Sequence, residues 1–283
     1  MIMRLLKNLR NRRVLIGPAI LFGLAMVAFS VLTLTQSTAK AQEALVSTNP
    51  NDIAAGAVLY SEHCQSCHGY QGEGGVVGGA PALVDKGAAA ANFYLTTGRM
   101  PLNAANNEAI RHHPLFNAAQ IRELDAYINA LPQITGIGGS GPTIPSVEPL
   151  CANQGTLAAQ SEKGCVTLSE GQQLFSINCA QCHQAAGSGN ILSNGNVIPS
   201  LNNATITQVA EAPLVGPKPM PIFTELSHAQ ISAIAQYVAY LHNAPNPGGF
   251  AIGRIGPVAE GFVAILGGFC LLWFAARMIG NRG

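Results

Sequence analysis

Two long apolar runs lie near the ends of the chain. Residues 14–34 are uncharged and mostly apolar, and they follow a basic stretch that holds five of the 15 lysines and arginines. The second run, residues 257–280, has Arg277 near its end, and Arg282 follows it. At about 1.5 Å per residue, each run is long enough to cross a membrane as a helix. Basic flanks favour the cytoplasmic side, so both chain ends are predicted inside and the polypeptide between them outside.

The first apolar run has two possible fates. Ala39-Lys40-Ala41 fits a small-x-small cleavage site, which would make residues 1–41 a removable signal peptide. The run at 14–34 exceeds the usual length of a signal peptide core, which slightly favours an uncleaved anchor. With either fate, the chain that follows is exported.

The chain between the apolar runs shows the spacing of amphipathic helices. From Asn117 to Leu131, apolar residues recur every three or four positions, at Ile121, Leu124 and Ile128. Pro132 is expected to end this helix, because proline lacks the amide hydrogen that the next turn needs.

The pattern of the first half returns in the second half. Glycine, leucine and an aromatic residue precede a cysteine with the same spacing at 56–64 and at 171–179. An Ala-Gln-Ile triplet at 119–121 recurs at 229–231. A repeat of this size indicates two copies of one module. In each copy, a helix before the cysteine and a helix after the triplet are expected to cross, with the aromatic and leucine side chains at their contact.

The repeat divides the chain into parts. We predict the two modules at residues 50–132 and 167–245, joined by a Gly/Pro-rich linker at 133–166 that lacks sustained periodicity. The C-terminal membrane helix is predicted within 255–280. The fold class is therefore all-α, with a membrane segment at each end.

Composition limits the classes of partner. Charged residues make up 10% of the chain and apolar ones 48%, which suits small helical domains with membrane segments. Residues 43–250 hold 13 acidic and 6 basic side chains, a net charge of −7. This acidic part excludes nucleic acid as a partner. It is compatible with docking to a basic protein surface, although a solvated acidic face is the more common explanation.

Two short runs carry the candidate chemistry, and both read Cys-x-x-Cys-His. This is the attachment signature of a c-type haem. Two thiols one short turn apart reach the two vinyl groups of one porphyrin and form thioethers, and the following histidine is held where its imidazole can bind the iron. The expected attachment residues are Cys64, Cys67, Cys179 and Cys182, and the expected iron ligands are His68 and His183.

Other readings of a Cys-x-x-Cys pair are a redox dithiol and half of a zinc site. A zinc module needs four ligands at compatible spacings. Here a histidine follows each pair directly, twice, in an exported chain, and this favours covalent haem.

Each expected haem needs a candidate for the sixth position of its iron. The globular part contains two methionines, Met100 and Met220, and each precedes a proline at an equivalent point of the repeat. A lone methionine usually fills a core, but one per module favours ligation. Histidine plus methionine closes both axial positions and raises the haem potential, which suits electron transfer and not the binding of O2 or peroxide. The competing histidines are the pair His112 and His113, which is the strongest rival for the first haem, and His63, His228 and His242.

Three cysteines lie outside these motifs. Cys151 and Cys165 enclose 13 residues in an exported linker, so a disulfide is favoured over two free thiols. Cys270 lies in the C-terminal apolar run and is expected to have no chemistry.

The whole arrangement resembles a known family. Two tandem Cys-x-x-Cys-His modules, Met100-Pro101 and Met220-Pro221, an exported N-terminus and a C-terminal anchor ending in Arg282 are similar to the dihaem cytochrome cc subunit of the actinobacterial cytochrome bcc complex. The resemblance covers almost the whole chain. It implies two tandem class I cytochrome c domains with two covalently bound haem c groups, between N-terminal and C-terminal transmembrane helices.

The resemblance also implies a function. The chain would be the electron-transfer subunit of a quinol–cytochrome c reductase in the cell membrane, with no substrate chemistry of its own. Its partners would be a cytochrome b subunit that oxidises menaquinol, a Rieske iron–sulfur subunit and the subunits of an aa3-type oxidase in a supercomplex. The haem domains would lie on the extracytoplasmic side and the C-terminus in the cytoplasm.

Two other functions remain open. One is a dihaem peroxidase or a thiosulfate-oxidising cytochrome, which would need an iron with an exchangeable or unusual sixth ligand. The other is a membrane-tethered cytochrome c that shuttles between complexes. Two candidate methionine ligands argue against the catalytic class.

Overall fold

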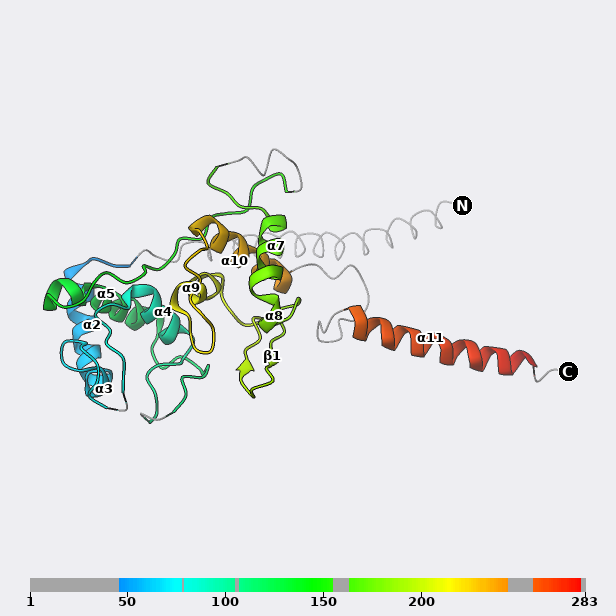
Figure 1. The fold of residues 1–283 in the computed structure, drawn as a ribbon, viewed down its shortest axis with the longest axis horizontal. Coiled ribbons are helices and arrows are strands. Elements are labelled where there is room, and N and C mark those ends of the chain that lie inside the picture. The colour runs from blue at the N-terminus through cyan, green and yellow to red at the C-terminus, as the bar shows by residue number, and fades with distance from the viewer. Residues whose placement is uncertain (1–45, 78, 105–106, 155–162, 244–256, 281–283) are drawn as a thin grey trace, which may run out of the picture. The chain divides into compact units, whose positions relative to one another are not determined.

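A computed structural model describes residues 46–77, 79–104, 107–154, 163–243 and 257–280. The predicted N-terminal membrane segment at 14–34 and the candidate cleavage site at 39–41 lie outside the described residues. Within them, the molecule is mostly helical (Figure 1).

The described residues of the first module form four helices. Asn49 begins the first one, because its side chain accepts a hydrogen bond from the backbone N–H of Asn51 at 3.0 Å. Asn117 begins the last one through a capping box with Gln120. The helices are α2 (Pro50–His63), α3 (Gln65–His68), α4 (Gly87–Thr96) and α5 (Ala118–Thr135).

The second module repeats this order and adds a small hairpin. Its helices are α7 (Leu168–Asn178), α8 (Ala180–His183), α9 (Ile206–Val215) and α10 (His228–Asn243). Strands β1 (Asn190–Ile191) and β2 (Val197–Ile198) pair antiparallel, with Ile191 opposite Val197. The described part of the chain contains no other strand, and the all-α prediction did not include this hairpin.

The predicted crossing of the first and last helix is present in both modules. A Cβ atom on Gly56 would lie 2.0 Å from the carbonyl oxygen of Glu123, and one on Gly171 would lie 2.1 Å from that of Ala233. Real Cβ atoms do not approach so closely, so only glycine lets α2 lie on α5 and α7 on α10 at this distance. Beside each glycine, an aromatic pair fills the contact: Tyr60 with Tyr127 at 5.2 Å, and Phe175 with Tyr237 at 5.6 Å between ring centroids.

The prediction that Pro132 ends its helix is wrong. Helix α5 continues through Pro132 to Thr135 and ends at Gly136, whose backbone is left-handed with φ 68°. Proline removes one amide donor, but the following turn is still supported. The N–H of Gly136 donates to the Pro132 carbonyl at 3.0 Å, and the Thr135 hydroxyl donates to the Leu131 carbonyl at 2.7 Å.

The C-terminal apolar run forms helix α11 (Pro257–Gly280), with the bounds that the sequence predicts. Residues Gly261–Gly280 have a mean hydropathy of 2.0, and none of them is buried in the structure. By length and composition, this helix can cross a membrane. Near its end, the Arg277 guanidinium lies 5.5 Å from the ring centroid of Trp273.

The linker between the modules is more ordered than its composition predicts. Its Pro142 carbonyl accepts from the N–H of Ala89 in α4 at 3.0 Å. Further along, Glu148 contacts α10, because its N–H donates to the Ser232 hydroxyl and its carbonyl accepts from the Gln236 amide at 2.7 Å. The linker is therefore bonded to a helix of each module.

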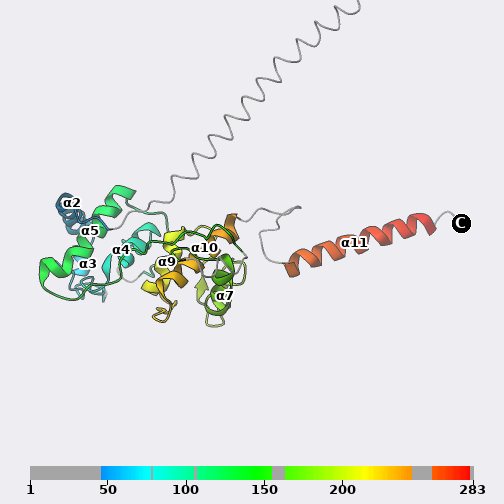
Figure 2. The same cartoon turned by 90° about the horizontal axis from the view of Figure 1, so that it is seen from above.

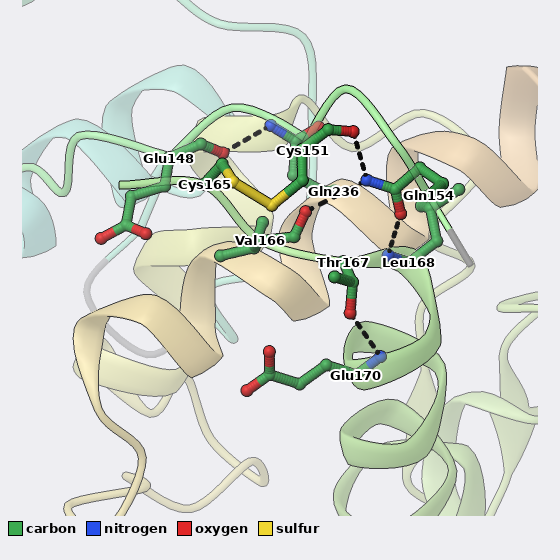
Figure 3. Close-up of a disulfide and its surroundings, with 9 residues drawn as sticks. All are labelled: Glu148, Cys151, Gln154, Cys165, Val166, Thr167, Leu168, Glu170 and Gln236. Atoms are coloured by element: carbon green, nitrogen blue, oxygen red, sulfur yellow. Dashed lines mark hydrogen bonds between the residues drawn. A yellow bond between two sulfur atoms is a disulfide. The ribbon is translucent and has the colours of Figure 1, made fainter. Parts of the chain in front are cut away.

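The predicted disulfide between Cys151 and Cys165 is present (Figure 3). Around it, the N–H of Cys151 donates to the carbonyl of Val166 at 3.0 Å, and the Gln154 side chain bridges the Cys151 carbonyl and the N–H of Leu168. Leu168 is the first residue of α7. The bridge thus joins the linker to the start of the second module.

Removing this disulfide should cost stability without removing the fold. The double variant C151S/C165S removes the crosslink between two residues that are 14 positions apart in the sequence. The entropy of closing such a loop in the unfolded chain predicts a loss of about 3 kcal/mol in the free energy of unfolding. Denaturant titration of the oxidised protein, followed by circular dichroism, measures the loss. C270S, which removes a free thiol of α11, is the control and should unfold like the unaltered chain. Equal midpoints for all three proteins would contradict the prediction.

The two modules contact each other through α4 and α9. These helices occupy the same place in their modules. Each follows the Cys-x-x-Cys-His helix and precedes the loop that contains the methionine. They lie side by side in both views (Figures 1 and 2). Among the described elements, theirs is the main helix–helix contact between the modules.

Candidate functional site

The Cys-x-x-Cys-His runs have the same local structure in both modules. Cys64 ends α2 and precedes the single turn of α3, so that the N–H of His68 donates to the Cys64 carbonyl at 2.9 Å. In the second module, the N–H of His183 donates to the Cys179 carbonyl, also at 2.9 Å. One helical turn therefore brings each histidine back over its first cysteine, as attachment to a single porphyrin requires.

A backbone carbonyl fixes each histidine ring. The Nδ1 atom of His68 lies 2.9 Å from the Pro81 carbonyl oxygen, and that of His183 lies 3.1 Å from the Pro199 carbonyl oxygen. A carbonyl only accepts, so Nδ1 carries the proton and Nε2 is left as the basic nitrogen that can bind iron. The sequence repeats Pro-x-Leu at both places, but spacing alone gave no role to these prolines.

Glycines bring the loop after each motif close to this carbonyl segment. A Cβ atom on Gly74 would lie 2.5 Å from the backbone nitrogen of Ala82, and one on Gly189 would lie 2.6 Å from the Ile198 carbonyl oxygen. Both glycines also have left-handed backbones, with φ 77° and 82°. The loop after each motif therefore lies directly against the backbone segment that carries the proline carbonyl.

The first cysteine of each motif is half-buried. Burial raises the pKa of Cys64 and of Cys179 to about 11, and the second cysteine of each pair adds to the rise. Both thiols are protonated at neutral pH. A redox dithiol needs a thiolate with a lowered pKa, so the redox alternative is disfavoured.

Burial also lowers the pKa of His183, although its contact with Pro199 opposes this change. The neutral imidazole is the form that binds a metal. The ring is thus held in the protonation state and orientation that an axial ligand needs.

The two candidate methionines have different surroundings. Met100 packs against the core cluster of the first module, which Cys64 also contacts. Met220 is not among the side chains packed against the second cluster in the described part of the chain. The structure therefore brings Met100 and Cys64 to one core and does not do so for Met220 and Cys179.

The rival histidines are placed as follows. His112 and His113 share with Met100 the lining of a cavity of about 810 Å³, whose lining residues lie within 98–103 and 107–115, so they stay near the first candidate ligand. His63 packs edge-on against Phe116 at 5.1 Å. His228 lies 3.7 Å from a Glu148 carboxylate oxygen at the start of α10, and His242 lies in the last turn of that helix.

The donor set fits haem c. In each module, two thiols and an imidazole with a free Nε2 lie on one short helical segment beside a buried core. One polar atom remains without a partner near the first site: Nη1 of Arg99, next to Met100, is buried and has no hydrogen bond. This nitrogen could donate to a carboxylate, and a haem carries two of them. Among the described residues, no carboxylate pairs with Arg99.

Comparisons with known proteins agree with this geometry. Residues 51–128 and 166–238 each match the family described as cytochrome c oxidase, cbb3-type, subunit III. The cytochrome bc1 complex cytochrome c subunit of Mycobacterium tuberculosis is 35% identical over 95% of this chain and 93% of its own. That of Corynebacterium efficiens is 32% identical over 98% of this chain and 92% of its own. The match to a crystal structure of cytochrome c4 from Pseudomonas stutzeri covers 66% of this chain and 96% of that chain, at 17% identity and a TM-score of 0.23.

The family and the fold imply covalently bound haem c, and they confirm the predicted cytochrome c module. The match of the family model to two separate stretches follows the internal repeat. The relatives extend over nearly the whole chain, including the regions outside the modules. The chain belongs to the family of cytochrome c subunits of cytochrome bc1 complexes.

Proposed function

We propose that this chain is a membrane-anchored dihaem cytochrome that passes electrons from a Rieske iron–sulfur protein to an aa3-type oxidase. The observation that carries the proposal is the duplication: two Cys-x-x-Cys-His turns, each with its histidine Nδ1 on a proline carbonyl. Relatives that share 35% identity over 95% of the chain are named as bc1 complex subunits. These names support an activity as part of a quinol–cytochrome c reductase.

The residues have separate tasks in holding the cofactors. When bound, haem supplies an iron that changes its charge by one electron. We assign thioether attachment to Cys64, Cys67, Cys179 and Cys182, the proximal ligands to His68 and His183, and the sixth ligands to Met100 and Met220. A haem iron ligated by both a histidine and a methionine would have no open position for O2 or peroxide.

A buried core lies directly beside the first motif. Tyr60 is 1% exposed, and its hydroxyl donates to the Gly69 carbonyl at 2.8 Å, directly after the first motif. Leu124 and Leu131 of α5 are fully buried beside it. This packing supports a site whose backbone next to the motif is held by buried side chains.

The membrane and partner assignments rest on charge and on the relatives. Helix α11 would anchor the chain, with Arg277 and the C-terminus on the cytoplasmic side and the haem modules outside. The disulfide suits that oxidising side. The proposed partners are a cytochrome b subunit, a Rieske subunit and an aa3-type oxidase in one supercomplex.

Purification from the native membrane tests this function. The tagged protein, extracted in a mild detergent, should bring cytochrome b, a Rieske protein and oxidase subunits in comparable amounts. Quantitative mass spectrometry measures the ratios, and an unrelated tagged membrane protein is the control. Recovery of the cytochrome alone, under conditions that keep other complexes whole, would favour the tethered shuttle or a catalytic dihaem protein instead.

A further inference from the structure

Two arginines lie close together beside the contact of the modules without a carboxylate partner. Arg99 follows α4 directly and precedes Met100. Its guanidinium lies 5.1 Å from the Phe93 ring centroid, and its buried Nη1 has no hydrogen bond. Among the described residues, neither Arg99 nor Arg111 forms an ion pair.

Contacts with the second module hold Arg111. Its Nη2 donates to the Asn203 carbonyl at 2.8 Å and to Oε1 of Gln208 at 3.1 Å. The Gln208 amide in turn donates to the hydroxyl of Thr96, at the end of α4, at 3.1 Å. Arg111 is therefore fixed by neutral acceptors, and its positive charge remains uncompensated.

The proximity of the two arginines has an energetic cost. The backbones that carry the two side chains lie against each other, because the N–H of His112 donates to the Thr97 carbonyl at 3.1 Å. Two like charges held close together are unfavourable unless an anion lies between or beside them, and the buried Nη1 of Arg99 adds a cost of desolvation. A planar guanidinium with an unused N–H matches a carboxylate in particular, because its fork can bind both oxygens.

We propose that Arg99, supported by Arg111, binds a propionate carboxylate of the haem in the first module. Arg99 is adjacent to the assigned sixth ligand of that haem, and a haem carries its two propionates away from the thioether-bonded vinyl groups. The second module has no equivalent, since Gly98-Arg99 corresponds to Gly216-Pro217 there. The inference rests on the proposed function only in requiring a haem on Cys64 and Cys67.

The role of Arg99 is therefore to position the cofactor and to set its potential. A positive charge beside a propionate offsets negative charge near the iron, which favours the reduced state. Because the contact exists in one module, it should raise the potential of one haem and leave the other unchanged.

Three variants of the full-length, haem-loaded protein test this role. R99Q removes the charge and the fork, whereas R99K keeps the charge and loses the fork. R122Q is the matched control, because Arg122 also lies in the first module but is 48% exposed and pairs with Asp52 at 3.6 Å. Spectroelectrochemical titration gives the potentials of the haems, and the resonance Raman band of the propionate bending vibration reports the contact itself.

We expect R99Q to change the reduction equilibrium of one haem by roughly tenfold, which is about 59 mV for one electron. The same haem should show a shifted propionate band in R99Q and in R99K, with a smaller change of potential in R99K. R122Q should leave both measurements unchanged. If R99Q does not fold, the propionate band of R99K decides alone.

An unshifted propionate band in R99K, or shifts in R99Q that R122Q reproduces, would overturn the inference. Failure of the proposed function would look different. The unaltered protein would then lack two covalent haems by pyridine haemochrome assay, or would purify without respiratory partners, whatever the variants show.

Discussion

Replacing Cys64 and Cys67 together by serine should halve the covalently bound haem of the purified protein. Each Cys-x-x-Cys-His turn is proposed to attach one haem through its own two thiols, and the turns lie in separate helical modules with separate cores. Loss of one pair leaves the other turn intact, so one haem per chain should remain. The pyridine haemochrome assay, normalised to protein, measures the ratio, and intact mass spectrometry gives the number of attached groups.

The matched variant in the second module makes this test specific. C179S/C182S should also leave one haem, and the two variants should retain haems with different potentials, because the module surroundings differ. Substituting both pairs should leave none. Loss of all haem from either double variant would mean that the modules mature together, and unchanged haem would show that these cysteines are not the attachment sites.

Replacing Met100 by leucine should lower the potential of one haem by on the order of 0.1 V, within the roughly 0.8 V range that axial ligands span. Leucine keeps the apolar volume in the core but cannot bind iron, and the loss of the thioether removes the stabilisation of the reduced state. The open sixth position should also let the reduced protein bind CO. Redox titration and the absorption spectrum under CO measure the two effects.

The other methionines give the comparison and the control. M220L should act in the same way on the second haem, although Met220 packs less closely on its module's core than Met100 does. M278L alters an exposed methionine of α11 and should change neither measurement. If M100L left the spectrum unaltered, the sixth ligand of the first haem would have to come from His112 or His113, which line the same cavity.

Much of the helical framework could be predicted from local spacing. The crossing helices carry a periodic apolar stripe and a glycine at their contact, and the repeat made each signal visible twice. Helix α11 was predicted within its bounds because its apolar run is long and its ends are marked. The disulfide between Cys151 and Cys165 could be predicted because no other exported cysteines remained to pair.

Other features depend on contacts that the sequence does not encode locally. Helices α4 and α9 are short, rich in alanine or interrupted by Pro213, and show no strong period. The hairpin of β1 and β2 has strands of two residues, which fall below any pattern length. Helix α5 passes Pro132 because its later turn finds other hydrogen bonds.

The site shows the same division between local and distant signals. The cysteines and histidines of each turn are neighbours in sequence, so their motif was visible. The carbonyls of Pro81 and Pro199, which fix the imidazoles, lie 13 and 16 residues away. The contact of Arg111 with Gln208 spans 97 residues, and only the packing of the modules brings the two side chains together.

The contact between α4 and α9 has the form of a homodimer interface enclosed in a single polypeptide, since equivalent helices of two copies pack on each other. In a true homodimer, every substitution appears on both sides and the two centres stay identical. Gene fusion removes that constraint. Here Gln208 of one copy meets Thr96 and Arg111 of the other, and the symmetric counterpart of this contact does not exist in the described residues. If each copy holds a haem, as proposed, the two chemically identical cofactors would differ in potential, and the electron would then have a preferred direction through the chain.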